Sequence, residues 1–415
     1  MFCLYSLLLH LLYPLYRVLS WFHPGVKQFY ASRKQLHEDI QRQLPRTAKP
    51  VYWLHASSVG ELDQAGALAR ALREEKDVFI AVSVFSASVR QAPAFADLFF
   101  RFPLDFRRTW RRLLPELRPA AFITMTWDVW PNLLWTLKQF SVPAYLCSAA
   151  LGKNSRHLHW PFRAFYRRCY ALFSGIGVVD RANQNRFREL APGHLIQITG
   201  DSRYDSILEK LNKSQPPAQF KVLQRLYPPD GPDRIILAST YSRCEETLFP
   251  LLEDLLRKQF VVLIFPHHID EPHLKEIEER LKIVHGATVS RLSVATSRPD
   301  VLIVDWLGLL AFAYSGARFC YVGGALHHRV HNTGEPAACG VTVITGPAID
   351  ASPVALSLEE RHALWRCTDT KDFAQRFQLL SEDRSLAEAA GERGRQFITE
   401  NAGASQRFVK TFLLG

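Results

Sequence analysis

From Val51 onward, short apolar runs alternate with amphipathic segments. In the first half of the chain the apolar runs are Val51–His55, Val78–Val84, Ala120–Thr124, Ala144–Cys147 and Ile176–Val179. Between the first two, a helix is predicted over Glu61–Glu75, with an apolar face formed by Leu62, Ala65, Leu68, Ala69 and Leu72. Short strands that alternate with helices are typical of βαβ units. We therefore expect this half to be a parallel α/β domain.

A second series of the same kind fills the other half. Its predicted strands are Arg234–Ala238, Val261–Phe265, Val301–Val304, Phe319–Val322 and Val341–Ile344. Helices are predicted near Glu245–Lys258 and Glu335–Cys339, and the tail Leu356–Leu414 is expected to be mainly helical. Between the two series lie Pro216, Pro217, Pro228, Pro229 and Pro232, a composition that favours a connector over a sheet interior.

The pattern divides the chain into segments. We expect residues 1–22 to be an anchor, 23–215 an N-terminal domain, 216–233 a linker, and 234–415 a C-terminal domain with a helical tail. The pattern favours two doubly wound α/β domains that face each other across a cleft, with ligands bound at the carboxyl ends of the strands. A sugar-nucleotide transferase is the leading functional class, whereas periodicity by itself supports only a two-domain α/β protein.

The first 22 residues are apolar, with no formal charge before Arg17 and no small-residue cleavage site after them. At 1.5 Å per residue, the uncharged run covers about 24 Å and the run to Phe22 about 33 Å, against a hydrocarbon core of about 30 Å. Tyr13, Tyr16 and Trp21 suit the headgroup level. The segment is expected either to anchor the chain in a membrane or to cover an apolar groove of the protein.

Net charge limits the possible binding partners, and cysteine content indicates the compartment. Lys and Arg number 51 against 40 Asp and Glu, a net charge of +11 that favours anionic partners. If the apolar segment is a membrane anchor, the cations that follow it predict that the body lies on the cytoplasmic side; they are Lys27, Arg33, Lys34, Arg42, Arg46 and Lys49. Seven cysteines without a C-x-x-C spacing favour a reducing compartment. Because no nucleic-acid-binding motif is present, nucleic acid is not expected as a partner.

Two carboxylates follow predicted strands of the first half. Glu61 closes the small-residue turn after the first strand, at the start of a helix, where a carboxylate is either a helix-dipole partner or a general base for an acceptor hydroxyl. Asp128 lies between Trp127 and Trp130 after a later strand. The tryptophans alone suit a core, but a carboxylate is seldom buried without a partner. Asp128 is therefore expected near the mouth of the cleft.

The second half offers an anion site. Ser239-Thr240-Tyr241 and Gly323-Gly324 end predicted strands, and hydroxyls and exposed amides at strand ends suit a phosphate. No Walker loop and no G-x-G-x-x-G is present, which disfavours ATP hydrolysis and dinucleotide redox chemistry. The histidines of residues 327–331 beside Arg329 suit donors to a phosphate or a carboxylate better than zinc ligands, since no H-E-x-x-H or cysteine partner accompanies them. Asn332 and Glu335 suit a helix cap and a ribose acceptor.

Taken in order, these motifs resemble those of the 3-deoxy-D-manno-octulosonic acid (Kdo) transferases of lipopolysaccharide synthesis, from the N-terminal anchor to about Pro347. The H-A-S-S-V-G-E loop at residues 55–61 is similar to the family's signature loop, and Trp130-Pro131-Asn132 to its W-P-N. The further matches are Gly200-Asp201-Ser202-Arg203-Tyr204-Asp205, Ala238-Ser239-Thr240, Pro266-His267, Asp305-x-x-Gly308, Gly323-Gly324 and His331-Asn332-x-x-Glu335-Pro336.

The resemblance implies a glycosyltransferase-B fold of two Rossmann-like domains. It also implies inverting transfer of Kdo from CMP-Kdo to a phosphorylated lipid A precursor at the cytoplasmic leaflet of the inner (plasma) membrane. It implies no cofactor and no metal in the transferase site. It makes Glu61 the catalytic base and Asp128 a second acidic group. The binding residues that it implies are Ser57, Ser58, Gly60, Arg203, Ser239, Thr240, Pro266, His267, Gly308, Gly323, Gly324, His331, Asn332 and Glu335.

The chain departs from the family pattern in places. Many members have P-R-H where this chain has Pro266-His267-His268, and G-E-L where it has Gly308-Leu309-Leu310; Thr126 stands where an acid is common. Arg243 or Arg329 can supply the charge that is missing at His267. The rival interpretation is another membrane-associated transferase of the same fold, with a different nucleotide sugar and a lipid acceptor, and donor choice separates the two.

Overall fold

The computed structural model describes residues 2–33, 36–44, 49–89, 91–213, 216–228 and 231–414. The chain folds into two compact units, Met1–Ser206 with Ala402–Gly415, and Ile207–Asn401. Several positions singled out in the sequence lie outside the described residues: Lys34, Arg46, the predicted domain end at residue 215, and Pro229.

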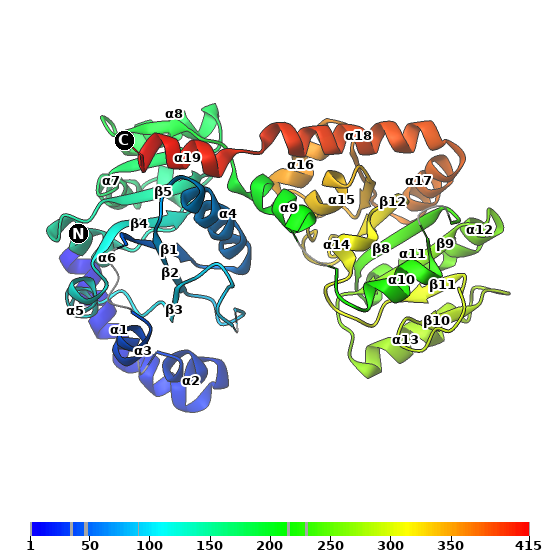
Figure 1. The fold of residues 1–415 in the computed structure, drawn as a ribbon, viewed down its shortest axis with the longest axis horizontal. Coiled ribbons are helices and arrows are strands. Elements are labelled where there is room, and N and C mark those ends of the chain that lie inside the picture. Colours follow the sequence, from blue (N-terminus) through cyan, green and yellow to red (C-terminus); the bar gives the residue numbers. More distant parts are fainter. Residues whose placement is uncertain are drawn as a thin grey trace. The chain divides into compact units, whose positions relative to one another are not determined.

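The first unit is built on a parallel sheet of seven strands in the order β3-β2-β1-β4-β5-β6-β7 (Figure 1). The strands are β1 Val51–Ala56, β2 Phe79–Val84, β3 Leu98–Arg101, β4 Pro119–Met125, β5 Ala144–Ala149, β6 Gly175–Val178 and β7 Ile196–Ile198. The helices are α1 Phe2–Phe22, α2 Pro24–Ala31, α3 Leu36–Gln43, α4 Val59–Glu75, α5 Arg107–Leu117, α6 Pro131–Gln139, α7 Arg163–Tyr170, α8 Arg181–Leu190 and α19 Ala404–Phe412.

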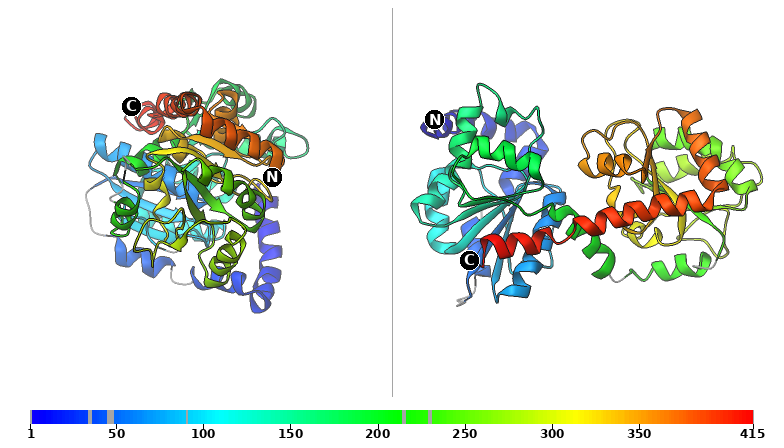
Figure 2. Two further views of the ribbon diagram at one scale, coloured as in Figure 1. Left: turned by 90° about the vertical axis from the view of Figure 1, so that its right-hand side faces the viewer. Right: turned by 90° about the horizontal axis from the view of Figure 1, so that it is seen from above.

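Helices cover both faces of this sheet, so every residue of β1 is buried (Figure 2). One face packs around Trp53, Trp110 and Phe122. The other face packs Leu54 and Ile123 against α4 and α19. Burial on both faces explains why the strands are continuous apolar runs and do not alternate apolar with polar residues.

The second unit repeats the plan. Its seven parallel strands lie in the order β10-β11-β9-β8-β12-β13-β14. They are β8 Arg234–Thr240, β9 Val261–Pro266, β10 Val289–Arg291, β11 Val301–Ile303, β12 Ala317–Val322, β13 Thr342–Thr345 and β14 Leu364–Arg366. The helices are α10 Phe220–Leu226, α11 Ser242–Leu248, α12 Leu252–Arg257, α13 Glu271–Leu281, α14 Leu310–Ala313, α15 Gly334–Ala338, α16 Pro353–Glu360, α17 Thr370–Glu382 and α18 Arg384–Asn401; α9, Ser202–Lys213, runs from the first unit into the second.

Each sheet reverses its winding direction once. In the first unit the chain turns from β1 toward β2 on one side and toward β4 on the other; in the second, β8 lies between β9 and β12 in the same way. In doubly wound sheets, ligands bind beside the carboxyl ends of the two strands that flank this switch point. The residues that follow β1 and β4, and those that follow β8 and β12, are therefore where a site is expected.

The α/β fold class is confirmed, and all the predicted strands are present within a few residues. Four short strands, β3, β7, β10 and β14, were not predicted from the sequence. They have three or four residues each, too few to show a period. The helix predicted near Glu245–Lys258 is interrupted by a 3₁₀ turn at Phe249–Leu251, because Pro250 has no backbone N–H to continue the α-helical hydrogen bonds.

The end of the chain returns to the first unit. The sequence analysis assigned the whole tail to the C-terminal domain, but α19 packs on α4 and on β5. Phe408 and Phe412 lie against Gly177 and Gly175 of β6, where a Cβ would meet their rings at about 2.5 Å. The Asp205 carboxylate accepts hydrogen bonds from the backbone N–H groups of Gly403, at 2.5 Å, and Ser405, at 2.7 Å, at the start of this helix.

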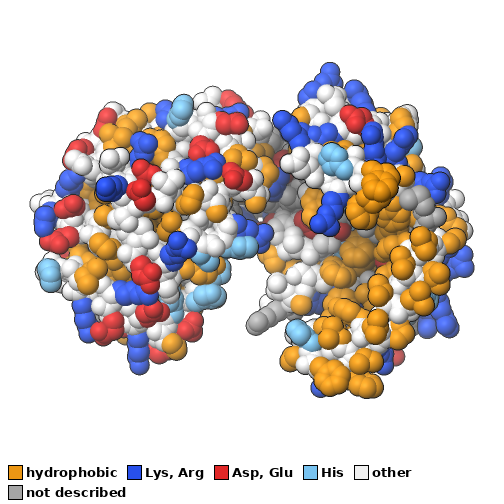
Figure 3. Space-filling view, turned by 180° about the vertical axis from the view of Figure 1, so that it is seen from behind, with side chains coloured by type: hydrophobic (Ala, Val, Ile, Leu, Met, Phe, Trp, Pro, Cys, Tyr) orange, Lys and Arg blue, Asp and Glu red, His pale blue; other side chains and the backbone are white. Residues whose placement is uncertain are grey.

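Helix α1 lies along the first unit. Tyr5 Oη donates to Asp105 Oδ2 at 3.1 Å, and the rings of His10 and Tyr13 lie 4.9 and 5.3 Å from that of Phe106. The opposite side of the helix is exposed and apolar; it consists of Leu4, Leu7, Leu8, Leu11, Leu12, Leu15, Val18 and Leu19. Figure 3 shows hydrophobic side chains gathered on this unit's surface. Among the described helices, α1 alone is long and apolar enough to cross a membrane.

Candidate functional site

Glu61 is held at the first turn of α4. Ser58 is the N-cap residue, and its Oγ accepts from the Glu61 N–H at 3.3 Å. In return, Glu61 Oε2 accepts from the backbone N–H groups of Ser57, at 2.6 Å, and Ser58, at 3.1 Å. This reciprocal capping box fixes the carboxylate directly beyond the carboxyl end of β1. Within the described residues no hydrogen bond reaches Oε1, so this oxygen is available to a substrate.

The electrostatics of Glu61 suit proton transfer. Burial, followed by the negative charge of Asp128, raises the pKa of Glu61 to about 7, despite the hydrogen bonds from Ser57 and Ser58. A general base is most effective when its pKa is near the working pH. The sequence analysis expected Glu61 to be a helix-dipole partner or a general base, and the structure adds the capping box. The capping box is compatible with catalysis because it uses only Oε2 of the carboxylate.

Asp128 follows β4, on the other side of the switch point, and is nearly fully buried, with 8% of its surface exposed. Its Oδ2 accepts from Ser57 Oγ at 2.7 Å and from Trp130 Nε1 at 2.9 Å, and lies 3.2 Å from His55 Nε2. Burial acts to raise the pKa of Asp128, but the hydrogen bond and charge of His55, followed by those two donors, outweigh it and lower the pKa below its usual value. Asp128 is therefore a fixed negative charge.

Ser57 joins the two carboxylates. Its N–H donates to Glu61 and its hydroxyl donates to Asp128. His55, at the end of β1, is fully buried and contacts Asp128 through Nε2 and Ser83 Oγ through Nδ1, at 2.9 Å. Gly60 has no atom within 4 Å of the place where a Cβ would stand, so the space over the first turn of α4 is open. A substrate can approach the backbone there.

The second unit gathers its predicted residues at the corresponding strand ends. Ser239 and Thr240 end β8, Pro266 ends β9, and Gly323 and Gly324 follow β12. A Cβ on Gly323 would lie 2.1 Å from the carbonyl oxygen of Ser239, so only glycine allows the two loops to approach this closely. Ser239 itself has φ +52°, a left-handed conformation that serine rarely adopts and that is often found at functional sites.

Aromatic and polar groups surround these loops. The Tyr241 ring lies 4.6 Å from that of His267, and Tyr241 Oη is 2.9 Å from His331 Nε2. Asn332 Oδ1 accepts from the Gly334 N–H at 2.9 Å, and Asn332 Nδ2 donates to Glu335 Oε1 at 2.9 Å. Asn332 therefore caps the start of α15 and orients the Glu335 carboxylate.

Some predicted residues are engaged elsewhere. Arg203 forms an ion pair with its neighbour Asp201, with Nη2 and Oδ2 2.6 Å apart. The Thr240 hydroxyl donates to Glu245 at 3.0 Å. Gly308, with φ +81°, lies in the loop after β11, and the adjacent Leu309 is fully buried. In the described part of the chain, no group of three or more His, Cys, Asp or Glu side chains has the geometry to hold a metal ion.

The structure also adds residues that the sequence analysis did not assign. His55 is part of the quoted loop, and Tyr241 follows Ala238-Ser239-Thr240 directly, but their contacts with Asp128 and His331 join positions 73 and 90 residues apart. No local pattern carries such pairings. Asp105 was not singled out at all; its carboxylate accepts from the N–H of Asn132 at 2.9 Å and so positions the Trp130-Pro131-Asn132 segment.

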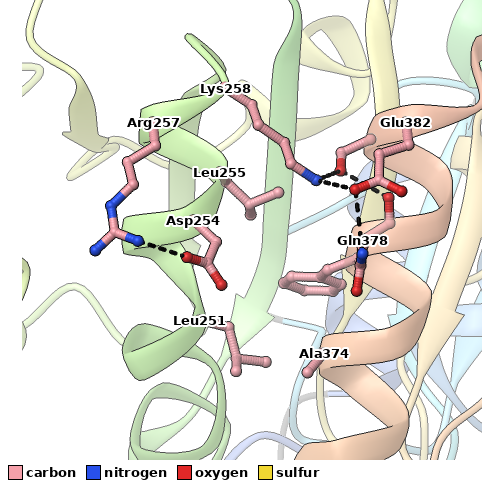
Figure 4. A pocket seen from close by; sticks show the side chains of 10 residues that line it. Leu251, Asp254, Leu255, Arg257, Lys258, Ala374, Gln378 and Glu382 are labelled. Atoms are coloured by element: carbon pink, nitrogen blue, oxygen red, sulfur yellow. Dashed lines mark hydrogen bonds and ion pairs between the residues drawn. The ribbon is translucent and has the colours of Figure 1, made fainter.

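A cavity of about 330 Å³ lies between α12 and α17, away from these residues (Figure 4). Leu251, Leu255 and Phe377 line it, and the ion pair between Lys258 and Glu382, at 2.8 Å, crosses its rim. Lys258 lies just before β9 begins, at the amino end of the sheet. The cavity is therefore separate from the strand ends where the candidate residues gather.

Comparisons with known proteins identify similar sequences. Residues 32–206 match the family model described as 3-deoxy-D-manno-octulosonic-acid transferase (kdotransferase). A 3-deoxy-D-manno-octulosonic acid transferase of Haemophilus influenzae is 27% identical over 86% of this chain and 85% of its own length, and that of Chlamydia muridarum is 25% identical over 91% and 88%.

Solved structures share the fold. The UDP-GlcNAc 2-epimerase of Neisseria meningitidis superposes with a TM-score of 0.62 at 15% identity, covering 88% of this chain and all of its own. MurG of Acinetobacter baumannii superposes with a TM-score of 0.53 at 14% identity, covering 88% and 99%. At these identities the likeness concerns the fold, which is of the glycosyltransferase-B type. The family model over residues 32–206, and relatives that match along nearly the whole sequence, both support a Kdo transferase.

Proposed function

We propose that Glu61 is the general base with which this Kdo transferase moves Kdo from CMP-Kdo to a hydroxyl of a phosphorylated lipid A precursor. The acceptor oxygen attacks the anomeric carbon of Kdo, the bond from that carbon to the CMP phosphate oxygen breaks, and Glu61 takes the hydroxyl proton. The observation that carries this proposal is the carboxylate with a pKa raised to about 7 and one unengaged oxygen, beyond the carboxyl end of β1.

Asp128 has a different role in this proposal. Its lowered pKa keeps it ionised, and its charge favours the proton-binding form of Glu61. Pairs of carboxylates whose environments separate their pKa values often divide acid–base work in this way. Asp128 also holds Ser57, whose N–H orients the base. We assign it as a positioning residue that also tunes the base.

The second unit is proposed to hold CMP. The backbone groups of the loops after β8 and β12, together with Ser239 and His267, supply donors where negative charge grows on the leaving phosphate. A well-placed donor at such a position contributes about 3 to 4 kcal/mol to transition-state stabilisation. Asn332 keeps Glu335 in one orientation, which suits a ribose hydroxyl.

We further propose that α1 lies in the plane of the membrane surface and does not cross the bilayer. Contacts with the folded unit run from Phe2, 6.2 Å from Phe165, to Tyr16, 5.6 Å from Tyr30. A helix bound to a polar domain along about 20 Å of its length cannot enter the hydrocarbon core without that domain. Its exposed leucines suit the acyl boundary, and a basic chain suits the anionic cytoplasmic leaflet.

The test is a transfer assay with radiolabelled CMP-Kdo and tetra-acylated lipid A precursor, using the full chain. Glu61→Gln and Glu61→Ala are expected to lose about 10²- to 10⁴-fold in kcat, because general bases contribute factors of this size. Glu75→Gln is the matched control, since Glu75 is exposed at the other end of α4. Near-normal turnover of the Glu61 variants would reject Glu61 as the base.

Donor choice tests the function separately. Turnover of CMP-Kdo with no turnover of other nucleotide sugars is expected. Transfer from a different nucleotide sugar, with none from CMP-Kdo, would favour the rival transferase of the same fold.

A further inference from the structure

Five rings in the second unit form what we call the histidine cluster: Tyr241, His267, His268, His327 and His331. His267 is at its centre, with ring centroids 4.6 Å from both Tyr241 and His331 and planes within 30° of parallel. His268 and His327 flank it, at 4.7 Å from the His267 ring and 4.3 Å from the Tyr241 ring respectively.

The cluster lies at the carboxyl edge of the sheet. Tyr241 follows β8, His267 and His268 follow β9, and His327 and His331 belong to the loop after β12. Backbone hydrogen bonds fix these loops together: the His267 N–H donates to the Thr240 carbonyl at 2.9 Å, and the His331 N–H to the Gly323 carbonyl at 3.0 Å. The rings therefore surround the switch point at which a doubly wound sheet binds its ligand.

One cation, Arg329, acts on His331 in the cluster. Among the ion pairs of the described residues, none joins an Asp or Glu to any of the four histidines. Burial, followed by the neighbouring histidines and Arg329, lowers the pKa of His331 to about 4, and burial with His268 and His327 lowers that of His267. The lowered pKa values of His267 and His331 favour the neutral imidazole in these two residues when no anion is bound.

We propose that the histidine cluster holds the phosphate of the donor nucleotide and that His267 takes up a proton when this phosphate binds. The inference rests on the proposed function, which places CMP in the second unit. An anion within a few Å favours the charged imidazole, and a protonated imidazole gives the phosphate a charge-assisted hydrogen bond. An arginine at this position would be charged in both states and would take up no proton.

Proton uptake makes donor binding depend on pH. A group whose pKa is higher in the complex than in the free protein binds its ligand more tightly at low pH and loses this advantage as pH rises through the pKa of the complex. With one proton taken up, the Kd rises with pH between 6 and 8 by at most about tenfold per pH unit, and it levels off above the pKa of the complex. The arginine variant His267→Arg is expected to bind with a Kd that changes little over this range.

The experiment is isothermal titration calorimetry of the full chain with cytidine 5′-methyl phosphate. This diester carries one negative charge that does not titrate near neutral pH, so any proton exchanged belongs to the protein. Measurement at pH 7 in buffers of different ionisation enthalpy gives the number of protons taken up per ligand. We expect net uptake in the wild type, loss of uptake in His267→Gln, and unchanged uptake in His285→Gln, a control at an exposed histidine outside the cluster.

The outcomes separate the two proposals. Binding of the diester without proton uptake, or uptake that persists in His267→Gln, overturns the histidine inference and leaves the donor assignment intact. Absence of binding at every pH between 6 and 8 overturns the placement of CMP in this unit, and the histidine inference with it. If His267→Gln has altered circular dichroism, His267→Arg provides the same comparison in a second variant.

Discussion

The carboxylates of Glu61 and Asp128 are linked by Ser57, and their surroundings shift their pKa values in opposite directions. The pKa of Glu61 is raised by burial and by Asp128, whereas His55 and the donors Ser57 and Trp130 lower that of Asp128. The negative charge of Asp128 therefore disfavours the ionised form of Glu61. At the residue scale, the proposed chemistry depends on the difference between these two pKa values more than on either side chain alone.

Replacement of Asp128 by Asn tests the coupling. Glu61 must be deprotonated to act as a base, so kcat/KM is expected to rise with pH through an apparent pKa of about 7. Asp128→Asn removes the charge that helps to raise this pKa, and the rising limb of the profile should move to lower pH. The measurement is kcat/KM for CMP-Kdo between pH 5 and 9.

The control for this change is Asp77→Asn, which removes an exposed carboxylate that pairs with Lys49. Its profile should coincide with that of the wild type. An Asp128→Asn profile that keeps its midpoint would show that Asp128 does not act on the titration of Glu61.

At the scale of elements, the first unit depends on its last helix. The Gly200-Asp201-Ser202-Arg203-Tyr204-Asp205 segment resembles a family motif, yet its side chains mostly hold the structure together. Arg203 pairs with Asp201, and Asp205 caps α19 through the N–H groups of Gly403 and Ser405. Arg407 of the same helix donates to the Thr199 carbonyl at 2.8 Å. Docking of α19 on the sheet thus requires this segment.

Asp205→Ala should loosen α19 without unfolding the unit. Loss of a helix cap costs about 1 to 2 kcal/mol, which corresponds to about 5- to 30-fold faster hydrogen exchange by local opening. Exchange of the α19 amides, followed by mass spectrometry, measures the effect, and Asp205→Asn should retain part of the protection. Unchanged exchange in Asp205→Ala would contradict the capping role.

At the scale of the whole molecule, the exposed side of α1 is an apolar surface. Leu8, Leu11 and Leu15 are 49%, 62% and 68% exposed, and they continue the same stripe. Burial of a leucine side chain contributes about 1.5 to 3 kcal/mol, so a few such residues suffice for membrane attachment. Because the other face of α1 packs on the folded unit, this stripe points away from that unit.

The triple variant Leu8→Ser, Leu11→Ser, Leu15→Ser should move the protein from the membrane to the soluble fraction. Removal of three leucines that the bilayer would bury is expected to weaken vesicle binding by at least about 100-fold. Flotation with vesicles that contain anionic lipid measures this, and Leu379→Ser, at an exposed leucine of the second unit, is the control. Unchanged flotation of the triple variant would remove α1 as the anchor.

Much of the fold was predictable because local patterns carry it. The apolar runs marked the central strands, since parallel strands buried on both faces are continuously apolar. The placement of Glu61 at a helix start was predictable from a small-residue turn followed by a helical period. The edge strands β3, β7, β10 and β14 were not predictable, because three or four residues carry no period and their strand geometry depends on a neighbour.

By itself, the sequence determined the α/β class, the order of its central elements, the position of Glu61 on its helix and the family that the chain resembles. Only the tertiary structure decided that Ser57 hydrogen-bonds Asp128, 71 positions later, that α19 returns to the first unit, and which side of α1 stays exposed. The physical reason is the separation along the sequence of the residues that make these contacts. Periodicity and propensity are properties of neighbouring residues, whereas these contacts depend on how many distant side chains pack at once.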